Sequence, residues 1–181
     1  MLQAHPSSPL FQRILVAIEP TTAAMLVDQA ITLAQRHQSH LLFTHIGAAF
    51  DETSAASVLY PGLDALYPTF NSPVLQHYSD EWVRAEARNR DWLRGFAQRA
   101  ANAGVEADIH QQLGEPGPLL CEIAREQNVD LLLVGRRGRS GLSELFLGSV
   151  SNYVLHHSPC AVLTLQIPQS SATVPAEPAL N

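Results

Sequence analysis

A glycine-rich segment in the last third of the chain has the residue types and spacing of a phosphate-binding loop. Gly135, Gly138 and the adjacent Gly148 and Ser149 follow the apolar run 131–134 at Gly-x2-Gly-x9-Gly-Ser spacing. Glycines let the backbone turn and approach a ligand closely. A helix that begins at Ser149 presents unpaired N–H groups and the positive end of its dipole. The segment therefore predicts a site for a phosphate group.

Three arginines in the same segment reverse the local charge. Arg136, Arg137 and Arg139 stand close together on a chain with a formal net charge of -6. Guanidinium groups bind phosphate oxygens through paired N–H donors, so this cluster suits an anion. The chain has eleven arginines and no lysine. This absence excludes a Walker A loop, a Schiff-base enzyme and the usual protein kinase, because each depends on a lysine.

The length and composition predict one domain of ordinary size. A chain of 181 residues with 46% hydrophobic residues can form one core and is too short for a second full domain. The acidic balance argues against general nucleic-acid binding. No apolar run is long enough to span a membrane, and Met1 to Pro9 lacks the charged start and apolar core of a secretory signal. These features predict a cytoplasmic protein.

Strand and helix patterns alternate along the chain as in an α/β protein. The continuous apolar run 14–18 indicates a strand that is buried on both faces, which is typical of a parallel sheet. Helical periodicity follows after Thr21 and Thr22, either of which can cap the helix, and a second strand is expected at 41–46. A strand, a helix and a strand with short connections form a right-handed crossover unit.

The second half of the chain continues the alternation. A long helix is predicted over 80–103, and the alternating residues 105–109 predict a strand with one solvent-exposed face, near an edge of the sheet. The remaining predicted elements are a helix from about Pro116, a strand at 130–134, a helix at 149–157 and a strand at 161–167.

Three segments fall outside this alternation. Around a single domain at 12–167, we expect a flexible amino terminus at 1–11 and a disordered tail at 168–181, which is rich in Pro, Ser and Ala. At about 48–78 the pattern lapses for longer than an ordinary loop. The leucines and aromatic residues of this insertion give it apolar surface, so it is a lid, a partner surface or an ordered insertion that only packs.

The cysteines and histidines predict no metal centre. Cys121 and Cys160 lie far apart within apolar patterns, so we expect two buried, reduced thiols. His156 and His157 are adjacent on a predicted helix and face different directions, which disfavours chelation of one ion. No metal site built from protein ligands is therefore expected.

The order of these elements and the glycine motif resemble the universal stress protein family. The likeness covers about residues 12–167 and rests on the run from Gly135 to Ser151, with Ser158-Pro159 introducing the fifth strand. The resemblance implies an open parallel five-stranded sheet of order 3-2-1-4-5 with helices on both faces, the adenine nucleotide alpha hydrolase-like fold. It also implies a nucleotide at the carboxyl ends of strands one and four, and homodimers joined through the strand Ala161–Ile167.

The resemblance assigns roles to individual residues. Glu19 takes the place of an acidic residue near the ribose, where the family more often has Asp, and Pro20-Thr21 replaces a small residue and Ser. Ile46 matches the residue whose backbone meets the adenine. The intact glycine motif resembles that of the ATP-binding branch. The implied nucleotide-binding residues are Ala17, Glu19, Ile46, Val134, Gly135, Arg137, Gly138, Gly148, Ser149 and Val150, with Arg136 and Arg139 as further phosphate contacts.

The sequence supports binding better than catalysis. Hydrolysis of ATP needs a positioned water and commonly a base, and the glycine segment offers cations and N–H donors but no convincing base. We therefore expect a stress-response or signalling protein that binds ATP, ADP, AMP or cyclic AMP, with Mg²⁺ or Mn²⁺ arriving through the phosphates. A protein partner, or the flexible parts of the chain, would read the bound state. The alternatives are a slow ATPase and a dimeric interaction module that works without nucleotide.

Overall fold

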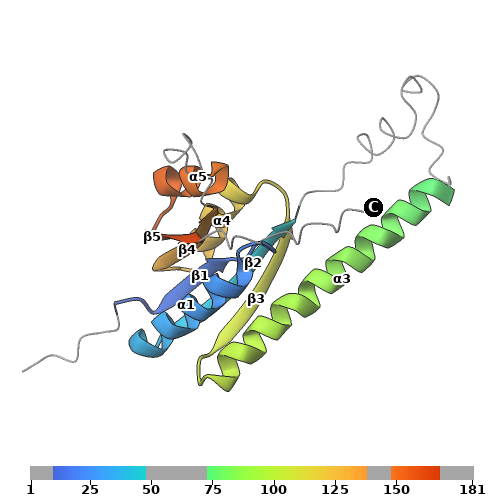
Figure 1. Ribbon diagram of the computed structural model, residues 1–181. Helices are drawn as coiled ribbons and strands as arrows, with labels where there is room; N and C mark the ends of the chain where they lie inside the picture. The colour runs from blue at the N-terminus through green and yellow to red at the C-terminus, as the bar shows by residue number, and fades with distance from the viewer. Residues whose placement is uncertain (1–9, 48–72, 138–147, 168–181) are drawn as a thin grey trace, which may run out of the picture.

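Five parallel strands form one sheet in the computed structural model (Figure 1). The structure describes residues 10–47, 73–137 and 148–167, and the side chains of these except 73–82, 136, 137 and 167. The strands stand in the order β3-β2-β1-β4-β5 and all neighbours are parallel, which confirms the predicted topology. Their bounds are β1 Arg13–Ala17, β2 His40–Gly47, β3 Ala107–Leu113, β4 Leu131–Arg137 and β5 Ala161–Ile167.

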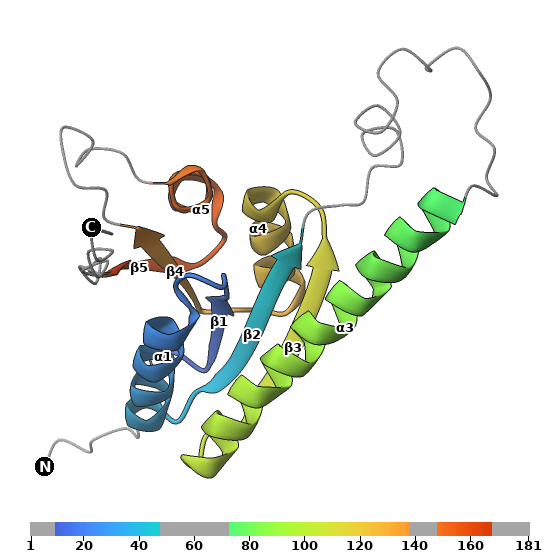
Figure 2. The ribbon, with the colours of Figure 1, turned by 45° about the vertical axis from the view of Figure 1, so that its right-hand side comes forward.

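Helices cover both faces of this sheet, as predicted (Figure 2). One hydrophobic core joins the sheet to α1 (Ala23–His37) and α3 (Pro73–Asn102). A second core, on the opposite face, joins the sheet to α4 (Pro116–Glu126) and α5 (Ser149–His157). No helix in the described part of the chain combines the length and apolar character that crossing a membrane requires.

The strand β1 is apolar where both of its faces are covered. Ile14, Leu15 and Val16 of β1 are completely buried, which explains why this run shows no polar alternation. At the edge of the sheet, β3 alternates instead. Ile109 packs against the core beneath α3, whereas Asp108 is exposed. The position of β3 at the end of the sheet confirms the prediction of an edge strand, but only Asp108 is exposed and the other residues of β3 are half-buried.

Aromatic side chains attach α3 to the sheet. The ring centroid of Phe96 lies 6.2 Å from that of Phe43 in β2 and 5.0 Å from that of Trp92, which is also in α3. The amino-terminal part of α3 extends past the carboxyl end of β3 in both views (Figures 1 and 2). Among the described side chains of α3, Val83 is 58% exposed, whereas the buried core residues Leu93, Phe96 and Ala100 all lie in the carboxyl-terminal half of the helix.

The helix α3 begins earlier than the sequence pattern predicts. It starts at Pro73 rather than near Asp80, so it includes the end of the insertion predicted at 48–78. Proline at the first position of a helix loses no hydrogen bond, because the N–H at that position has no partner within the helix. The rest of the insertion, most of the predicted flexible terminus 1–11 and the predicted tail 168–181 lie outside the described residues.

The strand β4 ends later than predicted. The apolar pattern indicates a strand at 130–134, but β4 runs on through Arg137. Gly135 pairs with Leu165, and Arg137 pairs with Ile167, so pairing with β5 continues past the apolar run. The glycine segment therefore begins inside the sheet rather than after it.

Both cysteines are free thiols, as predicted. Cys121 is buried in α4, and Cys160 is only partly buried before β5. Burial raises the pKa of each thiol, so both stay protonated at neutral pH.

Gly117 allows α4 to pack closely against α5. A Cβ atom at this position would lie 2.8 Å from Cγ and 3.0 Å from Cβ of Tyr153, so the ring cannot move aside without a shift of α5. We expect Gly117→Ala to lower the free energy of unfolding by about 1 kcal/mol, because overpacking typically costs about 1–3 kcal/mol and the better helix propensity of alanine offsets part of it. Urea unfolding followed by circular dichroism measures this loss.

Gly95→Ala is the matched control for this prediction. A Cβ atom at Gly95 in α3 would meet nothing within 4 Å, so alanine there should leave the stability unchanged or raise it. Equal unfolding midpoints for Gly117→Ala and the unsubstituted protein would contradict the close packing of α4 on Tyr153.

Candidate functional site

A cavity lies at the carboxyl ends of β1 and β4. β1 stands between β2 and β4, so the strands that follow β1 in the chain, β2 and β3, lie on one side of it, and β4 and β5 lie on the other. Open parallel sheets bind ligands at such a switch point. The cavity has a volume of about 120 Å³, which is room for several water molecules. It is lined by Ala17, Ile18, Glu19, Thr22, Thr44, His45, Ile46, Pro116, Leu120, Val134, Gly135 and Val150.

The fold brings together six of the residues that the sequence predicted for nucleotide binding. They come from segments that are far apart in the chain, at the ends of β1 and β2, in β4 and in the first turn of α5. All six line the one cavity: Ala17, Glu19, Ile46, Val134, Gly135 and Val150.

The other predicted residues belong to the glycine segment. Gly148 and Ser149 stand at the start of α5, where both are exposed and next to Val150, but they do not line the cavity. Arg136 and Arg137 lie in β4, and their side chains are outside the described part of the structure. Two predicted residues are outside it entirely: Gly138 and Arg139.

The start of α5 has the features of an anion-binding helix end. Gly148 is the N-cap residue, and none of the described side chains makes a capping hydrogen bond there. A Cβ atom at Gly148 would meet no described atom within 4 Å. The Ser151 hydroxyl donates a hydrogen bond of 3.4 Å to the Gly135 carbonyl, which joins this turn to β4. Because the first N–H groups of a helix have no partner within it, they can bind an anion here.

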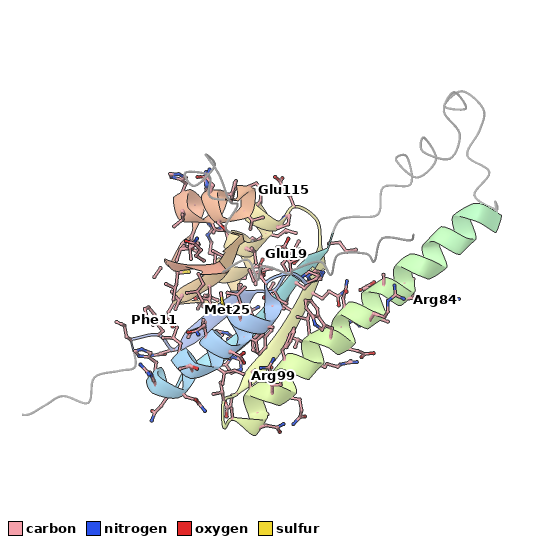
Figure 3. All side chains as sticks on the ribbon, viewed as in Figure 1. Phe11, Glu19, Met25, Arg84, Arg99 and Glu115 are labelled. Carbon is pink, nitrogen blue, oxygen red and sulfur yellow. The ribbon has the colours of Figure 1, made fainter. Side chains whose placement is uncertain are left out.

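Glu19 lies in the turn between β1 and α1, at the same edge of the sheet (Figure 3). Its carbonyl accepts hydrogen bonds of 3.0 Å from the N–H groups of Thr22 and Ala23, and one of 3.3 Å from the Thr22 hydroxyl. Thr22 is the N-cap of α1, but its hydroxyl bonds backward and not to the helix. The hydroxyl of Thr21 donates a hydrogen bond of 3.3 Å to the Glu19 carboxylate. The turn therefore fixes the backbone of Glu19 and helps orient its exposed carboxylate.

The cavity has an aliphatic wall and a polar side. Leu120 and Val134 are each 2% exposed, and together with Ile46 they form an apolar surface that suits a flat ring. The Glu19 carboxylate can accept hydrogen bonds from hydroxyl groups. Among the described side chains, no group of three or more His, Cys, Asp or Glu residues could hold a metal ion.

Sequence reasoning missed half of this lining. Thr44 lies on the same face of β2 as Ile46, because residues two apart in a strand share a face, and that periodicity could have identified it. Pro116 and Leu120 come from the first half of α4, whose helical pattern predicts burial but not contact with a ligand. The remaining missed residues, for which the sequence carries no such signal, are Ile18, Thr22 and His45.

These features define a class of α/β proteins with an open parallel sheet and a ligand cavity at the switch point. The sequence matches the universal stress protein family over residues 10–166, and the chain belongs to this family. One relative is a universal stress protein of Synechocystis, which is 32% identical over 157 residues that cover 86% of this chain and 98% of the relative.

Solved structures of family members share the fold. A universal stress protein family protein from Arabidopsis thaliana, with AMP bound, has a TM-score of 0.56 at 18% identity, over 87% of this chain and 93% of that one. A universal stress protein in complex with cAMP has a TM-score of 0.54 at 22% identity, over 86% of this chain and 97% of that one. These similarities confirm the predicted adenine nucleotide alpha hydrolase-like fold.

Proposed function

We propose that this universal stress protein binds an adenine nucleotide in the cavity at the ends of β1 and β4. One observation carries the proposal: a single cavity combines an aliphatic wall, Glu19, and Val150 in the first turn of α5. These features match, in that order, a flat base, the ribose hydroxyls and the phosphates. The two similar structures that contain AMP and cAMP support this proposal.

Each part of the nucleotide has its proposed partners. Ile46 and Val134 would contact the adenine, with Ala17 and Gly135 beside the base and ribose, and Glu19 would accept hydrogen bonds from the ribose. A divalent cation, Mg²⁺ or Mn²⁺, would be held mainly through the phosphates, because the described residues include no cluster of metal ligands. The proposed phosphate partners are Arg136, Arg137, Gly138, Arg139, Gly148, Ser149 and Val150.

Isothermal titration calorimetry with ATP, ADP, AMP and cyclic AMP tests this proposal. We expect saturable binding of at least one of them with a stoichiometry near one per chain. Adenosine and inorganic phosphate serve as controls for the two ends of the site, and each should bind more weakly than the nucleotide, since each reaches only part of the cavity. Absence of binding by all four nucleotides at millimolar concentration would overturn the proposal.

The biological role that we propose is a cytoplasmic stress response or signalling function with ATP as the ligand. A protein partner, or other parts of the same chain, would distinguish the bound from the free state. Mass spectrometry of the small molecules that remain bound after purification would identify the nucleotide, and recovery of a different class of ligand would contradict ATP.

We also propose that two copies of the chain join through β5. Within the described sheet β5 is the last strand and pairs with β4 on one side, so its other edge can pair with a second strand. Leu163 of β5 is 38% exposed and Leu155 of α5 is 43% exposed. A second copy would cover these apolar side chains.

Leu163→Asp should convert the proposed dimer into a monomer. A charge at this half-exposed position would have to be buried against the partner, which we expect to weaken association roughly tenfold or more. Size-exclusion chromatography with light scattering measures the change in mass. Leu10→Asp, at a position that is 72% exposed and outside β5, adds the same charge and should leave the mass unchanged. A Leu163→Asp variant that remains dimeric at low micromolar concentration would rule out this interface.

A further inference from the structure

The ring of His45 in β2 lies between the sheet and α3, in contact with Ile18, the residue that precedes Glu19. The residue is only 9% exposed. Its ring makes an edge contact with that of Trp92, with centroids 6.0 Å apart and an interplanar angle of 83°. Nε2 lies 3.4 Å from Nδ2 of Asn89, which is also in α3. The neighbours on α3 therefore fix the position of the imidazole.

The other ring nitrogen reaches the turn after β1. Nδ1 of His45 lies 3.0 Å from the carbonyl oxygen of Ile18. A carbonyl only accepts hydrogen bonds, so Nδ1 carries the proton and donates it. In the neutral ring Nε2 is then the acceptor, and it faces the amide group of Asn89. The surroundings thus select one tautomer, and its N–H points at the backbone of Ile18.

Ile18 is held at both of its backbone groups by consecutive residues of β2. Its N–H donates a hydrogen bond of 2.7 Å to the carbonyl of Thr44, and its carbonyl accepts the bond from His45. Ile18 follows the last residue of β1 and directly precedes Glu19. These two bonds therefore set where the chain leaves the sheet and where the backbone of Glu19 begins.

We propose that His45 is a positioning residue for the ribose end of the nucleotide site: its Nδ1–H holds the Ile18 carbonyl, and this contact presents the Glu19 carboxylate to the ribose hydroxyls. This inference rests on the proposed nucleotide binding. His45 acts through Ile18 and Glu19, so its effect should depend on whether the ligand has ribose hydroxyls. A residue that only stabilises the fold would affect all ligands alike.

Two substitutions distinguish the contribution of the N–H donor from that of the ring. His45→Phe keeps a ring that can contact Trp92 but has no N–H, whereas His45→Asn places an amide N–H near the position of Nδ1. The probes are ATP and 2′,3′-dideoxy-ATP, which lacks the hydroxyls that Glu19 would bind. Calorimetry should show that His45→Phe weakens ATP binding about 3- to 10-fold, the usual contribution of one hydrogen bond. It should leave the affinity for the dideoxy analogue unchanged, and His45→Asn should restore most of the ATP affinity.

The outcomes distinguish this inference from the proposed function. Equal losses for ATP and the dideoxy analogue, or no loss for either, would overturn the role of His45 and leave nucleotide binding intact. Absence of binding in the unsubstituted protein would overturn both. Hydrogen exchange provides a readout without ligand: the amides of Thr22 and Ala23, which bond to the Glu19 carbonyl, should exchange faster in His45→Phe than in His45→Asn. Equal exchange rates would contradict the positioning role.

A second variant that lacks the donor to Ile18 covers the case in which His45→Phe does not fold. In His45→Gln the amide group reaches the position of Nε2 rather than Nδ1, so it keeps a polar group beside Asn89 but provides no donor to Ile18. We expect the same selective loss of ATP affinity in this variant. Full ATP affinity in a folded His45→Gln protein would overturn the proposal.

Discussion

We expect replacement of Gly148 with valine to weaken the proposed ATP binding roughly 100-fold or more, because it would disrupt the charge-assisted hydrogen bonds proposed at the start of α5. The free protein has space for the new side chain, since a Cβ atom at Gly148 would meet no described atom within 4 Å. The backbone there has a φ of -54° and a ψ of 156°, which valine can adopt. The valine methyl groups would stand at the helix end where the phosphates are proposed to bind. Calorimetry with ATP measures the loss.

The stability of the Gly148→Val protein shows whether the effect is local. Valine is a poor N-cap residue, but the change from glycine should cost no more than about 1 kcal/mol of the free energy of unfolding. Gly95→Val is the matched control, because it adds the same side chain at another open position, in α3 and away from the cavity. Its ATP affinity should equal that of the unsubstituted protein. Undiminished ATP binding by a folded Gly148→Val protein would place the phosphates elsewhere.

We expect Phe43→Ala to lower the free energy of unfolding by about 3–5 kcal/mol, more than any other substitution that we propose. This is the usual cost of removing a buried phenylalanine ring. Phe43 is completely buried in β2, and its ring lies 6.2 Å from that of Phe96 in α3. Removing it leaves a cavity between α3 and the sheet, which the close-packed surroundings can fill only in part, since β2 is paired with a strand on each side. Urea unfolding followed by tryptophan fluorescence measures the change, since Trp92 packs on Phe96.

Val83→Ala is the control for this prediction. Val83 is 58% exposed in the amino-terminal half of α3, so its truncation should change the free energy of unfolding by less than about 0.5 kcal/mol. Similar losses in Phe43→Ala and Val83→Ala would contradict the arrangement in which the carboxyl-terminal half of α3 anchors the helix.

Much of the fold could be predicted because burial leaves a direct mark on the sequence. A strand that is covered on both faces favours an unbroken apolar run, as at 14–16 of β1, whereas the edge strand β3 begins with an alternation of apolar and polar residues at 107–109. The ends of elements were less predictable. Pro73 starts a helix although proline elsewhere breaks one, and β4 continues through Arg137 because of its pairing with β5. Neither fact follows from the local pattern.

The candidate site was predictable where a motif or a resemblance identified residues one by one. The positions carried over to Glu19, Ile46 and Val150 all line the cavity. The contributions of Pro116 and Leu120 depend on how α4 packs over the ends of the strands, which is a long-range property. The contact of His45 with Ile18 joins residues 27 apart in sequence, and no spacing rule predicts such a pair.

The extended pairing of β4 with β5 has a thermodynamic consequence. Gly135 and Arg137 belong to the proposed nucleotide site, and their partners, Leu165 and Ile167, belong to the strand through which two copies are proposed to join. If nucleotide binding alters the geometry of the end of β4, it alters the surface that β5 presents. Ligand affinity and subunit affinity would then be linked by one coupling free energy, and each equilibrium would shift the other by the same factor.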